Sequence, residues 1–585
     1  MDLKNNYWTK NSETVDGFFD QKEIALIASR IKSIKRIECD VFFSFESRFA
    51  KSGGLAAVTT KILPYLKEVT NISNVILLTP FYPNIIPANK LKPTGLSIKV
   101  PFDNKSYKAE ILKYVQDYEH SANGCIEEFY LKADGFFAAR NKLKDPYIYN
   151  ENNREKSDAA LRENSLFFCQ AAPFVLQKLG FNKNTLFHLQ DWETILIALT
   201  AKTAMLDGIL ESCASVCTLH NPFDSGWLKL DSLAKILDSE RSKKITENLK
   251  DNLTAHKVGL SLVDGALTTV SKNFAKELKQ DILHTGHFAP HLQNIFEKSG
   301  IKGVNNGMFV DFPPEFTEFA KPGQSPRISK ANINRVRKTK LEKRVELLKI
   351  LDNYHPPQRF GKLTYRNGPL THLPEDVPII LMSGRLDPNQ KGFDIFLRAI
   401  DKFREDEIKV VLSPLPVRES DLVIFRKVAK SSQGNVTVFP IRMAKGFHEL
   451  QIGSTFGLMP SVYEPFGAAI EYMVNGTLVI ARKTGGLVDQ IDHEINGLLF
   501  KESKRNYNLQ NIKSFMKASV RVELRQTNPW SQDMVDSLYK ILKRAIKLYQ
   551  KENEKYYEMI LNGFMKAQNF DWQTSAKEYY SVYKT

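Results

Sequence analysis

Short apolar runs rich in β-branched and aromatic residues alternate with segments of helical periodicity along this 585-residue chain. Each run ends at a polar or glycine-containing turn before the next helical segment begins. Repetition of strand then helix predicts parallel, doubly wound sheets, which means an α/β fold. In the first half of the chain the predicted strands are 39–45, 74–80, 185–189, 214–219 and 265–270.

A second series of the same kind begins after residue 376. Its predicted strands are 377–383, 409–412, 436–439, 457–459 and 477–481, with a helix at 393–403. A polar, basic and proline-containing stretch separates the two series and marks the boundary between them. The predicted domains are an extension (1–36), a Rossmann-like domain (37–320), a basic linker or insertion (321–376), a second Rossmann-like domain (377–545) and a helical segment (546–585).

Two doubly wound halves can present the carboxyl ends of their sheets to each other. In open α/β sheets, ligands bind at such ends, next to topological switch points. We therefore expect the functional site in a cleft between the halves, built from the loops that follow the strands.

Composition restricts the class of protein. Hydrophobic residues make up 42% of the chain and charged residues 25%, which excludes global disorder. No apolar run approaches the roughly 18 residues that span a bilayer, and the first 20 residues do not resemble a secretory signal. The cysteines show no metal-ligand spacing, so we expect reduced thiols and a cytoplasmic location. They are Cys39, Cys125, Cys169, Cys213 and Cys217.

The net charge of +16 is concentrated in one segment. Residues 321–350 hold ten basic and two acidic residues, which is half of the whole excess. We interpret this segment as a solvated helix, because Leu341, Val345, Leu348 and Leu351 follow helical spacing. Docking of an anionic effector is the second hypothesis. No nucleic-acid motif accompanies the charge, so we expect no nucleic-acid partner.

In the first half, polar residues follow three predicted strands. Gly53 and Gly54 form a turn after Lys51, where the backbone can approach a ligand and the next helix begins with an electropositive end. This combination suits a phosphate, although a glycine pair at such a turn is commonly a matter of geometry. Asp191 and His220 each follow a strand, so both are expected to point into the same cleft.

In the second half, the loop after the first strand carries Arg385 and Lys391. Two cations there could neutralise the diphosphate that leaves as a donor bond breaks, whereas isolated cations in a loop normally face solvent. Glu464 is expected just before a helix that starts near Phe466, with Glu471 inside it. The alternative for Glu464 is a simple interaction with the helix dipole. A further glycine turn, 484–486, could offer its N–H groups to phosphate.

Taken in order, these loops resemble those of the glycogen and starch synthase family of retaining glycosyltransferases, which has the two-domain GT-B fold. The resemblance runs from about Asp40 to the C-terminus. Its landmarks are the turn at Lys51, Pro80-Phe81-Tyr82, His188 to Trp192, Leu219-His220-Asn221, Thr269-Val270-Ser271, Val304 to Gly307, Arg385 to Gly392, Glu464 to Gly467, Thr484 to Leu487 and Phe570 to Tyr579.

The resemblance implies a role for each matching residue. Glu464 would act on the transferred glucose, Arg385 and Lys391 would hold the diphosphate, and Asp191 and His220 would lie beside the reacting glucose and the acceptor. The remaining implied donor contacts are Lys51, Gly53, Gly54, Asn306, Gly467, Glu471, Thr484, Gly485 and Gly486. The segment 546–585 is similar to the family's closing helix, which crosses back to the first domain.

The chain also departs from the bacterial pattern of this family. The spacing between Arg385 and Lys391 is similar to that of fungal and animal glycogen synthases, as is the presence of Glu471. Gln190 and Glu193 stand on either side of Asp191-Trp192, where histidines are usual. These departures leave the nucleotide of the donor undecided between ADP-glucose and UDP-glucose.

The implied reaction is transfer of glucose, with retention, from a nucleoside diphosphate glucose to the non-reducing end of an α-1,4-glucan. We expect no metal and no pyridoxal phosphate, no membrane partner, and a possible homo-oligomer. The alternatives are a retaining transferase with a small acceptor, a catalytically silent glucan-binding relative, a pyridoxal-dependent phosphorylase and a two-carboxylate glycosidase.

Overall fold

The computed structural model divides the chain into two compact units. The first comprises residues 1–307 and 572–585, and the second comprises residues 308–571. The residues that the structure describes are 17–116, 126–138, 148–149, 154–221, 226–249, 253–320, 328–353, 373–404, 406–415, 436–438, 446–518 and 521–584. The boundary of the first unit thus falls at Gly307, ahead of the expected position at 320.

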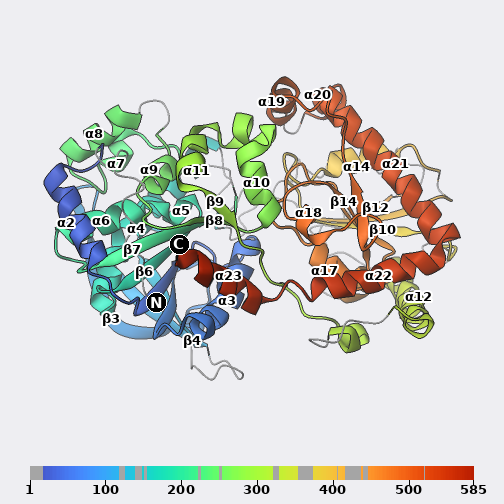
Figure 1. The fold of residues 1–585 in the computed structure, drawn as a ribbon, viewed down its shortest axis with the longest axis horizontal. Coiled ribbons are helices and arrows are strands. Elements are labelled where there is room, and N and C mark those ends of the chain that lie inside the picture. Colours follow the sequence, from blue (N-terminus) through green and yellow to red (C-terminus); the bar gives the residue numbers. More distant parts are fainter. Residues whose placement is uncertain are drawn as a thin grey trace. The chain divides into compact units, whose positions relative to one another are not determined.

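The first unit is built on a nine-stranded sheet with the order β3-β4-β5-β2-β1-β6-β7-β8-β9 (Figure 1). The five strands predicted for this half pair in parallel, as expected. The strands are β1 (Cys39–Phe43), β2 (Asn74–Pro80), β3 (Lys92–Phe102), β4 (Lys105–Gln116), β5 (Ile126–Ala133), β6 (Thr185–Gln190), β7 (Cys213–Leu219), β8 (Leu267–Thr269) and β9 (Ile301–Gly303).

An antiparallel edge formed by β3, β4 and β5 was not predicted. The turn between β3 and β4 is Asp103-Asn104, and both residues have positive φ, 53° and 56°. Two successive residues in this conformation form a type I′ turn, whose twist matches that of the flanking strands. The signal was therefore present in the sequence, as a short polar turn between two alternating strands.

Helices complete the first unit. They are α2 (Gln21–Lys32), α3 (Gly54–Thr70), α4 (Arg154–Leu179), α5 (Trp192–Ile195), α6 (Ile197–Leu206), α7 (Leu230–Leu233), α8 (Ser239–Leu249), α9 (Ala255–Leu260), α10 (Lys272–Gln280), α11 (Gln293–Ser299) and α23 (Trp572–Tyr583). Helix α2 lies in the segment predicted as an extension, and a capping box of Asp20 and Glu23 caps its N-terminus. It buries Ile27 and Ile31, so it is part of the unit's core.

Helix α23 joins the first unit although the whole second unit precedes it in the chain. It packs against α3 (Figure 1). The hydroxyl of Tyr583 lies 2.6 Å from Nδ1 of His188, and Thr218 Oγ1 lies 2.6 Å from Nε2 of the same ring. Burial lowers the pKa of His188 well below its ordinary value, so the ring is neutral. Its two nitrogens link α23 to β6 and β7.

Asp40 is a carboxyl in the centre of the first unit's sheet. It lies on β1, opposite Val75 of β2 and Leu186 of β6. Its side chain is fully buried, and no hydrogen-bond partner for either carboxyl oxygen lies among the described residues. Burial raises the pKa of Asp40 to about 8, because the charged form loses its hydration without gaining a partner. The group is therefore mostly protonated at neutral pH.

The second unit is a six-stranded parallel sheet with the order β12-β11-β10-β13-β14-β15 (Figure 1). All five predicted strands are present, and β15 is additional. The strands are β10 (Ile379–Arg385), β11 (Lys409–Leu415), β12 (Val436–Val438), β13 (Phe456–Met459), β14 (Leu478–Arg482) and β15 (Gly497–Phe500). The two units thus confirm the predicted class of two doubly wound α/β domains.

The helices of the second unit include one from the segment predicted as a linker. They are α12 (Lys330–Asn353), α14 (Phe393–Ile400), α16 (Phe447–Gly453), α17 (Ala469–Val474), α18 (Leu487–Gln490), α19 (Leu509–Ala518), α20 (Val522–Gln526), α21 (Pro529–Lys551) and α22 (Asn553–Ala567). The segment 546–585 therefore comprises the end of α21, all of α22, and α23, of which only α23 belongs to the first unit.

Helix α12 corrects the interpretation of the basic segment as a solvated helix. Val345, expected on the apolar face, is 52% exposed, whereas Lys340 and Arg344 are buried. Lys340 Nζ donates to the carbonyl of Ser454 at 2.6 Å, and Arg344 Nη2 donates to that of Val377 at 2.8 Å. Backbone carbonyls thus accept hydrogen bonds from both buried side chains, which apolar spacing alone could not foresee. The residues 321–327 and 354–372 lie outside the described residues.

Candidate active site

In the first unit, Asp191 and His220 meet at the carboxyl ends of β6 and β7, as predicted. Asp191 Oδ1 accepts hydrogen bonds from the backbone N–H of His220 at 2.6 Å and of Asn221 at 3.3 Å. Asp191 adopts φ 58° and ψ −177°, a strained conformation for a residue with a side chain. The two strand ends are therefore fixed to each other through the Asp191 carboxylate.

The imidazole of His220 is held by Gln190, the last residue of β6. His220 Nε2 lies 2.7 Å from Gln190 Oε1. Because an amide oxygen only accepts hydrogen bonds, Nε2 carries the proton and Nδ1 holds the lone pair. Desolvation lowers the pKa of His220, against smaller raising effects of Asp191 and Glu46. A neutral ring at pH 7 can accept a proton or a hydrogen bond at Nδ1.

The glycine turn before α3 is already occupied by a carboxylate. Glu46 Oε2 accepts hydrogen bonds from the N–H groups of Ser52 at 3.0 Å, Gly53 at 2.9 Å and Ala56 at 3.3 Å. The expectation that the N–H groups of this turn hold phosphate therefore needs correction for Ser52 and Gly53, because Glu46 takes them. Lys51 remains exposed beside the turn. Gly54 is the first residue of α3.

Asn306 offers a hydrogen-bond acceptor that the first unit leaves unused. Its side chain is 2% exposed, and within the part of the chain that the structure describes its Oδ1 atom has no hydrogen-bond partner. Its own N–H donates to the carbonyl of Val270 at 3.3 Å, which places it beside the end of β8. A buried orphan acceptor is costly unless a ligand or water completes it.

In the second unit, Lys391 and Glu464 form an ion pair. Lys391 Nζ lies 2.7 Å from Glu464 Oε2, and the hydroxyl of Ser461 donates to the same oxygen at 2.9 Å. Glu464 is only 5% exposed. The two residues come from the loops after β10 and β13, which are neighbouring parallel strands. Arg385 is the last residue of β10 and is half-buried.

The second glycine turn packs against the backbone of Glu464. The N–H of Gly486 donates to the Glu464 carbonyl at 2.9 Å. Gly485 has φ 49°, and a Cβ there would lie 1.8 Å from the same carbonyl oxygen. Only glycine permits this approach. Thr484 is buried next to it. The turn therefore supports Glu464, a role the sequence did not suggest.

The helix after Glu464 starts later than predicted. Helix α17 begins at Ala469, not near Phe466. Gly467 lies between them with φ 90°, and its positive φ keeps this stretch non-helical. Glu471 is therefore in the first turn of α17 and is half-buried.

Sequence reasoning missed three side chains around these loops: Glu46, Ser461 and Arg525. Glu46 and Ser461 stand five residues before Lys51 and three before Glu464, so closeness in the chain could have drawn attention to them. Arg525 lies more than 130 residues from the loop that it contacts, and no pattern in the sequence connects the two.

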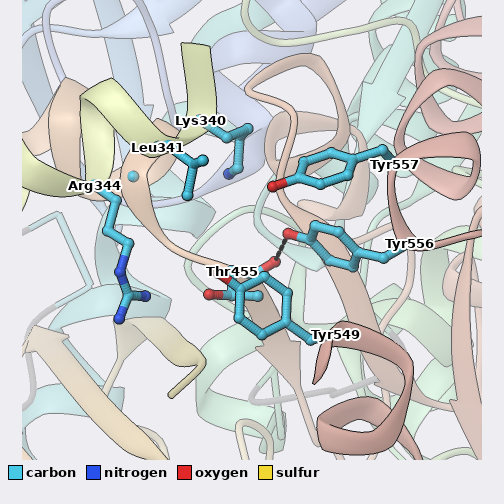
Figure 2. A pocket seen from close by; sticks show the side chains of 8 residues that line it. Lys340, Leu341, Arg344, Thr455, Tyr549, Tyr556 and Tyr557 are labelled. Carbon is cyan, nitrogen blue, oxygen red and sulfur yellow. Dashed lines mark hydrogen bonds between the residues drawn. The ribbon is translucent and has the colours of Figure 1, made fainter. Parts of the chain in front are cut away.

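A small cavity in the second unit lies away from the predicted residues. It has a volume of about 10 Å³, room for roughly one water molecule. Figure 2 shows Tyr549, Tyr556 and Tyr557 across from Lys340 and Arg344, with the Tyr556 hydroxyl donating to the Thr455 carbonyl at 2.8 Å. None of the predicted site residues lines this cavity.

Within the ranges that the structure describes, no three His, Cys, Asp or Glu side chains gather as metal ligands would. None of the helices in those ranges is both long and apolar enough to cross a bilayer.

Comparison with known proteins assigns each unit to a domain family. A family model described as the starch synthase catalytic domain matches residues 41–295, and one described as glycosyl transferases group 1 matches residues 370–527. The glycogen synthase of Lactococcus lactis is 25% identical over 94% of this chain and 98% of its own length. That of Aliivibrio fischeri is 26% identical over 92% and 95%.

Among solved structures, the fold is similar to the catalytic domain of starch synthase IV from Arabidopsis thaliana, bound to ADP and acarbose. The TM-score is 0.65 with 19% sequence identity, over 94% of this chain and 99% of that one. This likeness concerns the fold.

Proposed function

Because the chain belongs to the glycogen and starch synthase family of glycosyltransferases, we propose that it extends an α-1,4-glucan. Glucose would pass, with retention of configuration, from a nucleoside diphosphate glucose to the non-reducing end of the glucan. The matches of both domain families, and of relatives named glycogen synthase over nearly their full length, support this proposal.

The observation that carries the proposal is the Lys391–Glu464 ion pair. A pair with one buried and one half-buried partner at the carboxyl ends of two neighbouring strands is a poor way to stabilise a fold, since desolvation of Glu464 offsets much of the attraction. The pair suits a site in which Lys391 and Glu464 each bind a different part of the substrate. A diphosphate would draw the Lys391 ammonium away, and the freed Glu464 carboxylate would accept hydrogen bonds from the hydroxyls of the glucose.

Charge development explains why cations are required. As the bond between glucose and diphosphate breaks, negative charge grows on the departing phosphate oxygens. Lys391 and Arg385 would stabilise that charge from fixed positions, so no reorganisation is needed during the reaction. Alignment of the acceptor hydroxyl on the same face as the leaving group supplies the rest of the acceleration.

In the first unit, we assign the acceptor side to Asp191 and His220. The lone pair on His220 Nδ1 can accept a hydrogen bond from a sugar hydroxyl, and the Asp191 carboxylate fixes the loop that carries the ring. We retain as proposed donor contacts the residues Lys51, Gly54, Asn306, Gly467, Glu471, Thr484 and Gly485, and we drop Gly53 and Gly486 because their N–H groups are already bonded within the chain. Of these, Asn306 has the clearest structural support, through its unused acceptor.

The proposal includes both ADP-glucose and UDP-glucose as donors. We expect the side chains of residues 439–445 to decide which base binds, and these residues lie outside the described residues. We further propose that the reaction needs neither a metal nor pyridoxal phosphate and takes place in the cytoplasm. The free thiols of Cys39, Cys169, Cys213 and Cys217 are compatible with a reducing compartment.

The test is a primer-extension assay with glycogen, offering ADP-glucose and UDP-glucose separately, with and without EDTA. Wild-type protein is expected to extend the primer with one of them, and EDTA is expected to change nothing. Glu464→Ala and Lys391→Ala should each lower kcat/KM by about 100-fold or more. The matched control is Lys338→Ala, since Lys338 is 79% exposed. A folded wild-type protein that extends no primer with either donor would refute the proposal.

A further inference from the structure

Arg525 is a fully buried arginine that contacts the loop carrying Arg385 and Lys391. It lies on the short helix α20 and is 1% exposed. Its Nε and Nη2 atoms donate to the two carboxylate oxygens of Asp394, at 2.8 and 3.0 Å. Its guanidinium also stacks on Phe515, with 3.7 Å between Cζ and the ring centroid. Such a bidentate and stacked arrangement fixes the guanidinium plane.

The remaining donors of Arg525 reach beyond this ion pair, into the loop. Nη2 also donates to the carbonyl of Pro388 at 2.6 Å, and Nη1 donates to Asn389 Oδ1 at 3.3 Å. These two residues lie at the middle of the loop, between Arg385 and Lys391. A structural ion pair with Asp394 alone would not need them.

The loop has few other contacts that fix its middle. Asp387 organises it from within, because its carbonyl accepts from the N–H of Lys391 at 2.9 Å and its carboxylate from that of Asn389 at 2.9 Å. The carbonyl of Gln390 accepts from the N–H of Val462 at 2.7 Å, which joins this loop to the one that carries Glu464. Displacement of Pro388 and Asn389 would therefore be felt at both loops.

We propose that Arg525 is a positioning residue for donor binding: it holds the loop so that the two cations meet the diphosphate in the correct geometry. This inference rests on the proposed function, and it adds a residue that does not itself touch the donor. Lysine cannot replace it, because one ammonium cannot bind Asp394 in a bidentate manner and also reach the Pro388 carbonyl.

The experiment compares Arg525→Lys and Arg525→Ala with wild type in the full chain. Donor KM, glucan KM, kcat and the melting temperature are measured for each. The proposal expects donor KM to rise about tenfold or more in both variants, with glucan KM unchanged. Millimolar guanidinium should partly restore donor KM in Arg525→Ala, by occupying the vacated site. Arg521→Ala is the matched control, since Arg521 is an exposed arginine beside the same helix.

A purely structural role predicts a different result. The melting temperature and the active fraction would fall, while the remaining active protein kept a normal donor KM, and that outcome overturns the inference. If Arg525→Ala does not fold, Asn389→Ala removes only the acceptor in the loop and should still raise donor KM. The proposed function itself would be refuted by a wild-type protein that neither transfers glucose nor binds ADP or UDP. This inference alone would be refuted if the wild type is active and Arg525→Lys has an unchanged donor KM.

Discussion

Replacement of Asp40 by asparagine should make the protein more stable, by an amount that depends on pH. The native state keeps the Asp40 carboxyl protonated up to a pKa of about 8, against an ordinary value of 3.8. Between these values the native chain binds one more proton than the unfolded chain. The free energy of unfolding of wild type therefore falls as pH rises, by about 1.4 kcal/mol for each pH unit.

The size of the effect follows from this interval. At pH 7 the unfolded carboxyl is ionised and the buried one is not, so burial costs roughly 4 kcal/mol relative to a group that never ionises. Below about pH 4 the cost disappears, because both states are protonated. Asp40→Asn removes the titration but keeps a polar group of nearly the same shape at the site, so the variant isolates the proton-linked part of the cost.

The assay is urea unfolding of the full chain at pH 5, 6, 7 and 8, followed by a signal of the first unit. The stability gain of Asp40→Asn over wild type should grow by about 1.4 kcal/mol per pH unit from pH 5 to 7, and by less from pH 7 to 8, where the native carboxyl begins to ionise. Asp231→Asn, at an exposed position of the same unit, should show no such trend. An equal difference between Asp40→Asn and wild type at pH 5 and at pH 8 would refute the reasoning.

Two further substitutions test contacts around the loops and the last helix. Gly485→Ala would place a Cβ 1.8 Å from the Glu464 carbonyl oxygen, at a residue with positive φ. The substitution should therefore displace Glu464 and lower kcat/KM by about 100-fold in the primer-extension assay. A near-normal kcat/KM would contradict this account of the turn. Tyr583→Phe removes the hydroxyl next to His188 Nδ1 and should lower the free energy of unfolding by about 1–3 kcal/mol, measured by urea unfolding. An unchanged stability would mean that water replaces the hydroxyl.

Ten of the strands could be predicted because most of their residues are apolar or small and buried. In β1 and β7, for instance, every residue is buried, so the sequence signal is strong. The antiparallel strand β3 alternates between exposed and buried residues only in its second half, so its sequence signal is weaker. For helix α12 the prediction of a solvated charged face was wrong at two positions. Carbonyl groups from distant segments accept hydrogen bonds from Lys340 and Arg344, which are therefore buried.

In the site, closeness of residues could be predicted where they follow neighbouring parallel strands. The ends of β6 and β7 are adjacent, so the closeness of Asp191 and His220 could be predicted. The ion pair between Lys391 and Glu464 was not expected, although the loops that carry them follow neighbouring strands. The sequence could not reveal that the Glu46 carboxylate takes the N–H groups of the first glycine turn. Such partners depend on side-chain geometry, which no spacing rule describes.

The membership of α23 in the first unit has a consequence for how the chain folds during synthesis. The sheet of that unit is complete in sequence by Gly303, yet the helix that packs on α3 comes only at residues 572–583. The nascent first unit must therefore wait, with this face of α3 uncovered and His188 lacking its Tyr583 partner, while more than 260 further residues are translated. Exposed apolar surface on an incomplete domain invites aggregation. A chain shortened by its last fourteen residues would remain permanently in that state.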